Sequence, residues 1–196
     1  MKKLLAILGS PHKNGSSAAM LSQACETAED AGWEVTTIYL YEEHISFCTG
    51  CRKCMQHGIC IYEDGIQKIA RLLKCCDAVV LSAPVYWANV PAAVKNMFDR
   101  LLGTAMEDTA AFPRPRLSKN QKYLILTSCN TPFPFSWICG QSRGAIRAMD
   151  EFFKTSGMKS MGRITWAGAK GSPDLPDRTV KKIRRCFSGS YKIRVM

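Results

Sequence analysis

Apolar residues along the chain follow two alternating patterns. Residues 4–8 and 78–81 are continuous apolar runs, typical of strands buried on both faces of a parallel sheet. Residues 16–31 instead carry apolar side chains at helical spacing, and Gly32 stands where that helix should end. Further strands are expected at 34–40, 123–127 and 159–166, and further helices at 65–76, 91–102, 145–157 and 176–187. Five strands that alternate with helices predict an α/β fold, a three-layer sandwich around a parallel sheet.

One domain is expected to account for all 196 residues. The chain contains no repeat, no low-complexity linker and no break in composition, and its length suits a single well-buried core. Residues 104–120, which include Pro113 and Pro115, are expected to form a loop. A second, cysteine-rich loop is expected at 44–64. We therefore treat residues 1–196 as one domain with two long loops.

Composition favours a cytoplasmic protein without a membrane partner. The apolar run at the start stops at Gly9, too short for a signal peptide, and no stretch approaches the roughly 20 apolar residues that cross a bilayer. Thiols stay reduced in the cytoplasm, so the ten cysteines point to metal or redox chemistry rather than to disulfides.

Positive charge exceeds negative charge along the chain. The formal net charge is +11, from 27 basic and 16 acidic side chains. Such a balance favours anionic cofactors, acidic proteins or nucleic acid, but no nucleic-acid motif accompanies it. Much of the excess lies near the C-terminus, at Lys181, Lys182, Arg184, Arg185, Lys192 and Arg194. We interpret it as a solvated basic surface and expect no nucleic-acid partner.

The loop after the first strand, residues 9–17, has the composition of an anion site. Its hydroxyls, its small residues and the helix that follows would offer N–H groups and a positive helix end to a phosphate. It lacks the lysine of a Walker A loop, and it is not the dinucleotide motif G-x-G-x-x-G. The alternative is that Ser16 or Ser17 merely caps the helix. A cap needs only one such residue, so the phosphate site is favoured.

Three blocks carry a resemblance to a known family: Gly9-Ser10-Pro11-x-Lys13-x-Gly15-Ser16-Ser17, Ala83-Pro84-Val85-Tyr86-Trp87 and Lys95-Asn96-x-x-Asp99-Arg100. Together they resemble the flavodoxin-like NADPH-dependent FMN reductases. The resemblance implies strand order 2-1-3-4-5 and an FMN cofactor. His12 stands where the family commonly has arginine, and Ser16 where it often has asparagine.

The resemblance also implies which residues meet the flavin. Those at the phosphate are Ser10, His12, Ser16 and Ser17, with Lys13 and Asn14 close by. Those along the ribityl chain and ring are Pro84, Val85, Tyr86, Trp87 and Asn89. The loop after the fourth strand should end at the same sheet edge, so we expect it to approach the flavin with Ser128, Cys129, Asn130 and Thr131. Beyond it, Phe133, Phe135 and Trp137 either cover the ring or close a dimer interface.

The cysteine-rich loop carries a ligand-like motif. Cys48, Cys51, Cys54 and Cys60 have the spacing C-x2-C-x2-C-x5-C, which allows three thiols and a nearby fourth to surround an iron–sulfur cube. The spacing is similar to that of the iron–sulfur flavoproteins, a branch of the same family, which implies a [4Fe–4S] cluster. An empty structural thiol loop, a zinc site and reversible thiol oxidation remain alternatives.

These features predict an FMN-dependent oxidoreductase or electron carrier. NAD(P)H would be a transient donor, ferredoxin a partner if the cluster is present, and a small molecule or protein the acceptor. Hydride transfer requires no acid or base, so no side chain is named as catalytic. The resemblance implies a homodimer or homotetramer. The rival hypotheses are a flavin-free binding module of the same fold and a thiol-based redox sensor.

Overall fold

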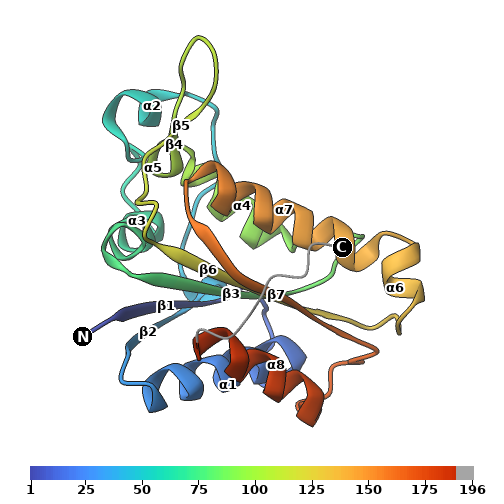
Figure 1. Ribbon diagram of the computed structural model, residues 1–196. Coiled ribbons are helices and arrows are strands. Elements are labelled where there is room, and N and C mark those ends of the chain that lie inside the picture. Colours follow the sequence, from blue (N-terminus) through green and yellow to red (C-terminus); the bar gives the residue numbers. More distant parts are fainter. Residues whose placement is uncertain (189–196) are drawn as a thin grey trace.

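The computed structural model describes residues 1–188 and contains a five-stranded sheet whose strands are all parallel (Figure 1). The strands are β1 (Lys3–Leu8), β2 (Glu34–Tyr39), β3 (Ala78–Pro84), β6 (Lys122–Cys129) and β7 (Lys159–Ala167). Their order is β2-β1-β3-β6-β7, which is 2-1-3-4-5 when these strands alone are counted. The predicted fold class and strand order are confirmed.

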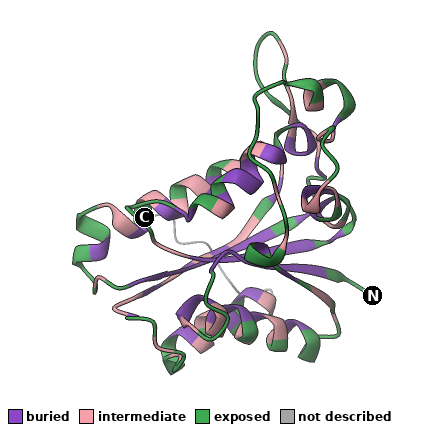
Figure 2. Cartoon of the chain, turned by 180° about the vertical axis from the view of Figure 1, so that it is seen from behind, coloured by how far each residue is buried: buried purple, intermediate pink, exposed green. Residues whose placement is uncertain are grey.

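Helices cover both faces of the sheet, as the three-layer prediction requires (Figure 1). On one face lie α1 (Ser16–Asp30) and α8 (Asp177–Phe187), and on the other lie α3 (Gly65–Cys75), α4 (Ala92–Arg100) and α7 (Gln141–Thr155). Each pair of layers encloses its own apolar cluster. The central strands β1, β3 and β6 are almost wholly buried (Figure 2), which explains the continuous apolar runs in the sequence.

The expectation of a plain loop at 104–120 is wrong. The segment begins inside α5 (Leu102–Ala105) and continues into the short antiparallel pair β4 (Met106–Glu107) and β5 (Arg114–Pro115). The two prolines suggested a loop, but proline is tolerated at a sheet edge, where its missing N–H costs no ladder bond.

Three further short elements lack a pattern long enough to predict. The predicted loop at 44–64 contains α2 (Lys53–His57), a 3-10 turn η1 (Leu40–Glu42) precedes it, and α6 (Phe135–Ile138) follows β6. Elements of one turn are too short to show a helical period.

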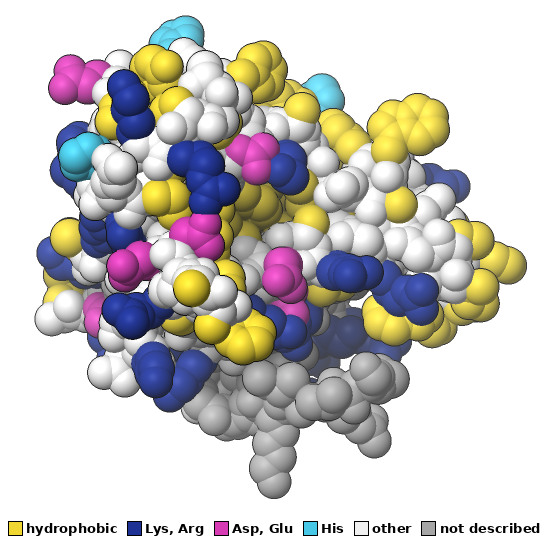
Figure 3. All heavy atoms as spheres, turned by 90° about the horizontal axis from the view of Figure 1, so that it is seen from above, with side chains coloured by type: hydrophobic (Ala, Val, Ile, Leu, Met, Phe, Trp, Pro, Cys, Tyr) yellow, Lys and Arg dark blue, Asp and Glu magenta, His cyan; other side chains and the backbone are white. Residues whose placement is uncertain are grey.

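The basic side chains do not gather on the face seen in Figure 3. On the face shown in Figure 3, Lys and Arg side chains are interspersed with apolar and acidic ones rather than gathered in one patch. Lys192 and Arg194 lie outside the described residues. None of the helices in residues 1–188 combines the length and the apolar character that a bilayer crossing requires.

A polar cluster lies under α7. The Asp150 carboxylate accepts hydrogen bonds from the Tyr123 hydroxyl at 2.6 Å and from Arg163 Nε at 2.7 Å, and it pairs with Lys154 at 2.6 Å. Burial alone would raise the pKa of Asp150, but the hydrogen bonds from Arg163, Lys154 and Tyr123 lower it below its ordinary value.

This cluster predicts an acid-dependent loss of stability. A carboxyl whose pKa is lower in the folded state stabilises that state above its unfolded pKa, near 3.9, and the contribution disappears as pH falls through the folded value. Asp150→Asn is expected to lower the free energy of unfolding by about 1–3 kcal/mol at pH 7. Urea unfolding from pH 7 to pH 3 should show the gap between wild type and variant closing. A gap that stays constant would contradict the assignment.

Candidate functional site

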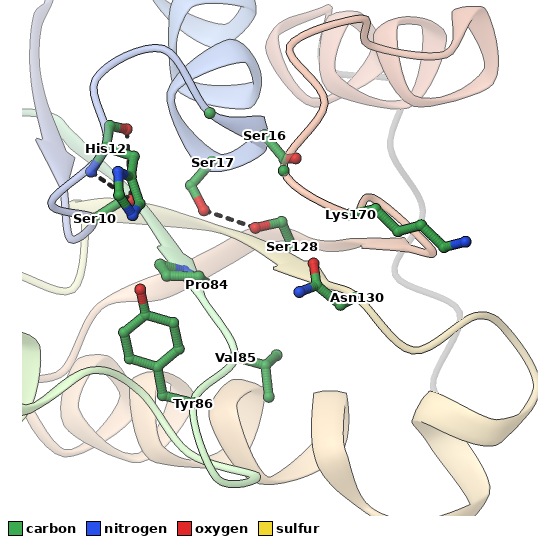
Figure 4. Close-up of a pocket in the computed structure, with 12 residues that line it drawn as sticks. Ser10, His12, Ser16, Ser17, Pro84, Val85, Tyr86, Ser128, Asn130 and Lys170 are labelled. Atoms are coloured by element: carbon green, nitrogen blue, oxygen red, sulfur yellow. Dashed lines mark hydrogen bonds between the residues drawn. The ribbon is translucent and has the colours of Figure 1, made fainter.

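A cavity of about 270 Å³ lies at the carboxyl ends of the central strands (Figure 4). Its walls come from four loops, which follow β1, β3, β6 and β7. The lining residues are Ser10, His12, Gly15, Ser16, Ser17, Pro84, Val85, Tyr86, Ser128, Asn130, Lys170 and Gly171. Ligands of open parallel sheets bind in this position, where the strand order reverses.

The two serines that open α1 do not cap it. Gly15 is the N-cap, and no side chain of the described residues caps the helix there. Ser16 Oγ donates instead to the Ser172 carbonyl at 2.7 Å, and the Ser17 and Ser128 hydroxyls share a buried hydrogen bond of 2.8 Å. The simple capping alternative is therefore wrong. The start of α1 is left open to an anion at the cavity.

The rest of the first loop divides into residues that line the cavity and residues that do not. His12 lines it, and its backbone N–H donates to Ser10 Oγ at 3.2 Å. Lys13 pairs with Glu42 and lies 4.5 Å from the centre of the Tyr39 ring, so its charge is already engaged outside the cavity. Asn14 is exposed and is not part of the lining.

The opposite wall is a tight turn after β3. Tyr86 and Asn89 exchange backbone hydrogen bonds of 2.8 and 2.9 Å, and the two residues between them have positive φ angles, 50° at Trp87 and 57° at Ala88. Non-glycine residues adopt this conformation at a cost of order 1 kcal/mol or more and cluster at functional sites. Tyr86 lines the cavity, whereas Trp87 is 100% exposed.

Helix α7 supports this turn from behind. A Cβ added to Gly144 would lie 1.9 Å from the Ala88 carbonyl oxygen, so only glycine allows the helix and the turn to approach so closely. The Val85 N–H donates to the Ser128 carbonyl at 2.9 Å and joins the turn to the end of β6. The Tyr86 wall is thus fixed on two sides.

The cavity lies at the sheet edge where the sequence predicts a ligand site, but only some of the predicted residues line it. The predicted contacts Lys13, Asn14, Trp87, Asn89, Cys129 and Thr131 are outside the lining. Lys170 and Gly171 line it and were missed. The available signal was their position after β7, because parallel strands all end at the same edge. Flavin contact by any of these residues remains a prediction.

The four motif cysteines line a second, much smaller cavity of about 20 Å³. Cys48, Cys51, Cys54 and Cys60 share it with Arg100. A hydrogen bond from the Lys53 backbone N–H lowers the pKa of the exposed Cys51 thiol. Within residues 1–188, no three His, Cys, Asp or Glu side chains lie close enough together to hold a metal ion. The motif therefore gathers the thiols around one cavity without setting them at ligand distances.

Arg100 joins the two ends of the cysteine-rich loop. Its guanidinium donates to both Asp64 carboxylate oxygens, at 2.8 and 3.0 Å, and to the Ser46 carbonyl at 2.5 Å. Its Nε donates to Cys60 Sγ at 3.3 Å. One turn earlier on α4, the Asn96 amide donates to the Ser46 carbonyl at 3.3 Å. The side chain of Arg100 is fully buried, so a fixed positive charge lies beside the thiols.

The cysteine-rich loop has the donor atoms and the charge that a thiolate-ligated group requires. Four thiols face one cavity, and a buried guanidinium would offset the negative charge of thiolates there. Gly50 and Gly58 both have φ of +69°, which allows the tight turns that such a loop needs. A Cβ at Gly103 would lie 2.2 Å from the Cys54 carbonyl oxygen, so the loop packs directly on α5. The donor chemistry of these residues therefore suits a thiolate-ligated cluster.

Comparison with known proteins identifies the family. The sequence model of the NADPH-dependent FMN reductases matches residues 2–128. An iron-sulfur flavoprotein of Archaeoglobus fulgidus is 40% identical over 100 residues, which are 51% of this chain and 46% of that protein. An iron-sulfur flavoprotein of Methanosarcina thermophila is 32% identical over 98 residues, 50% of this chain and 51% of the relative. The chain spans about half the length of the curated relatives that it matches.

Solved structures share the fold over nearly the whole chain. The NAD(P)H:quinone oxidoreductase from Methanothermobacter marburgensis has a TM-score of 0.73 at 16% identity, covering 99% of this chain and 98% of the other. An FMN-dependent NADH-azoreductase from Bacillus anthracis, solved in complex with FMN, has a TM-score of 0.73 at 12% identity, covering 96% and 99%. At these identities the likeness shows the fold alone.

Proposed function

Because the chain belongs to the NADPH-dependent FMN reductase family, we propose that it binds FMN in the 270 Å³ cavity and acts as an FMN-dependent oxidoreductase. The single observation that carries the proposal is the lining of this cavity, where hydroxyls and the open start of α1 lie across from the Tyr86 turn. One end suits a phosphate and the other a planar ring.

The chain's own residues would bind and orient the cofactor. Ser10, His12, Ser16 and the first N–H groups of α1 would hold the phosphate, and Tyr86 would lie along the ring, with backbone groups around Pro84 at its polar edge. FMN itself supplies the acceptance of hydride from a reduced nicotinamide and the release of electrons singly or in pairs. The protein contributes position and electrostatics, and no acid or base is required of it.

Ser16→Asp tests the flavin site. The variant loses the hydrogen bond from Ser16 to the Ser172 carbonyl, but a carboxylate in the first turn of a helix is favoured by the helix dipole, so the variant should still fold. The carboxylate would repel a phosphate. We expect FMN to bind about 100-fold more weakly and riboflavin to bind nearly as before, as measured by fluorescence titration. Ser22→Asp, on the exposed side of the same helix, should leave both affinities unchanged. A wild-type protein that is colourless and rejects FMN would favour a flavin-free binding module.

We further propose a [4Fe–4S] cluster on Cys48, Cys51, Cys54 and Cys60, which would exchange single electrons with the flavin. The shared cavity of these thiols, the buried Arg100 beside Cys60 and the likeness to iron-sulfur flavoproteins support it. Anaerobic purification should yield about four iron and four sulfide per chain, and Cys60→Ser should lower both. Cys75→Ser changes an exposed cysteine outside the motif and should keep them. Oxidant-dependent bridges among the four thiols, without iron, would favour the redox sensor instead.

The partners follow from this chemistry. We propose NAD(P)H or a ferredoxin-type carrier as donor, a small molecule or protein as acceptor, and the cytoplasm as the compartment. Exposed aromatic side chains in and just before α6 support a homodimer or homotetramer, because Phe133, Phe135 and Trp137 are 74%, 59% and 44% exposed. Light scattering of the purified protein would give the subunit number.

A further inference from the structure

The loop after β7 forms the wall of the large cavity that no sequence motif indicated. Lys170 and Gly171 line the cavity there, and Figure 4 shows Lys170 beside Asn130, its side chain extending past Asn130 and away from the Ser17–Ser128 pair. Residue 170 is exposed, and its long stem can reorient toward a ligand.

The backbone of this loop is held against the first loop and against β6. Ser16 Oγ donates to the Ser172 carbonyl at 2.7 Å. The Gly168 and Ala169 N–H groups donate to the carbonyls of Thr131 and Cys129, each at 3.1 Å. These bonds fix the position of Lys170 relative to the start of α1.

Lys170 also has a costly backbone conformation. Its φ is +46°, between Gly168 at +77° and Gly171 at +79°. Glycine would adopt this conformation without strain, yet the chain has a lysine there. Because strained non-glycine residues cluster at functional sites, we expect the lysine side chain to have a role at this cavity.

The charges around the cavity single out the same residue. Among residues 1–188, Lys170 is the only Lys, Arg, Asp or Glu in the lining. Lys13, the cation of the first loop, pairs with Glu42 outside the cavity. Within residues 1–188, no carboxylate forms an ion pair with Lys170. The nearest acid along the loop, Asp174, accepts from Ser172 and is not part of the lining.

We propose that Lys170 is the cation that neutralises the phosphate of the bound flavin and so selects phosphorylated flavin over riboflavin. The inference rests on the proposed FMN site, and it adds a residue from beyond the segment that matches the family, which ends at residue 128. A dianion held by neutral hydroxyls and N–H groups alone would lack a counter-charge. The ammonium of Lys170 supplies one by a charge-assisted hydrogen bond.

The test compares two ligands that differ only in the phosphate. Lys170→Gln removes the charge and keeps most of the stem, and it should weaken FMN binding by about 10- to 100-fold while riboflavin binding changes less than about twofold. Lys170→Arg should retain most of the FMN affinity. Lys119→Gln, at an exposed lysine outside the cavity, should change neither affinity. Raising the salt concentration should weaken FMN binding to the wild type more than to Lys170→Gln.

The possible results distinguish a failure of the Lys170 role from a failure of the proposed FMN site. If Lys170→Gln binds FMN as tightly as the wild type does, the proposed role of Lys170 is wrong, whereas the proposed FMN site is unaffected. Equal losses for FMN and riboflavin would overturn it too, because they would indicate a change in loop structure rather than a lost charge. A wild type that binds neither ligand would overturn the FMN site itself.

Discussion

Arg100→Met is expected to lower the free energy of unfolding by about 3–5 kcal/mol, because it removes one partner of a buried ion pair. The guanidinium is fully buried and donates to Asp64, to the Ser46 carbonyl and to Cys60 Sγ. Methionine fills a similar volume but leaves the Asp64 carboxylate and the Ser46 carbonyl short of donors. Urea unfolding at pH 7 would measure the loss.

Lys95→Met is the matched control. It lies on the same helix and removes an exposed ion pair with Asp99, of 2.5 Å, so the change in stability should stay within about 0.5 kcal/mol. Anaerobically purified Arg100→Met should also contain less iron, since both ends of the cysteine loop lose their common partner. An Arg100→Met protein as stable as the control would mean that the loop does not depend on this residue.

Gly144→Ala is expected to destabilise the protein by about 1–3 kcal/mol and to weaken FMN binding by at least about tenfold. The new Cβ would lie 1.9 Å from the Ala88 carbonyl oxygen, and this backbone atom belongs to a turn that is already strained at Trp87 and Ala88. The turn must shift, and the Tyr86 wall of the cavity must move with it. Urea unfolding and FMN titration would measure the two effects.

Gly103→Ala introduces a comparable clash at the other cavity, 2.2 Å from the Cys54 carbonyl oxygen. It should reduce the iron content and leave FMN affinity nearly unchanged, the opposite pattern to Gly144→Ala. If both variants lost flavin and iron together, the two cavities would not be independent, and the local explanation of each glycine would be wrong.

The sheet and its main helices could be predicted because their patterns are long. Residues 4–8 and 78–81 are apolar at every position, and α1 ends just before Gly32, whose φ is +78°. Short elements could not be predicted, because the four residues of α6 make one turn. The pair β4–β5 could not be predicted either, because Pro113 and Pro115 suggested a loop.

The cavity could be predicted only in part, for a different reason. The loops after the first, third and fourth predicted strands were recognised by their composition or by the family resemblance. Lys170 follows the last strand, and nothing in Gly168-Ala169-Lys170-Gly171 states that the loop turns toward α1. That direction depends on the hydrogen bond between Ser16 and Ser172, two residues 156 positions apart. The order of the strands predicts at which edge of the sheet this loop lies. That Lys170 lines the cavity depends on the tertiary contact and could not be predicted from the sequence.

Helix α4 acts as a common spacer for the two cavities. Near its start, Val94 packs where a side chain on Gly9 would clash at 2.4 Å, and at its end Arg100 holds the cysteine loop. Arg100 lies six residues after Val94, so the helix holds them about 9 Å apart along its axis. Inserting or deleting one residue in α4 would rotate Arg100 by about 100° relative to Val94, so this helix tolerates changes in its exposed side chains far better than changes in its length.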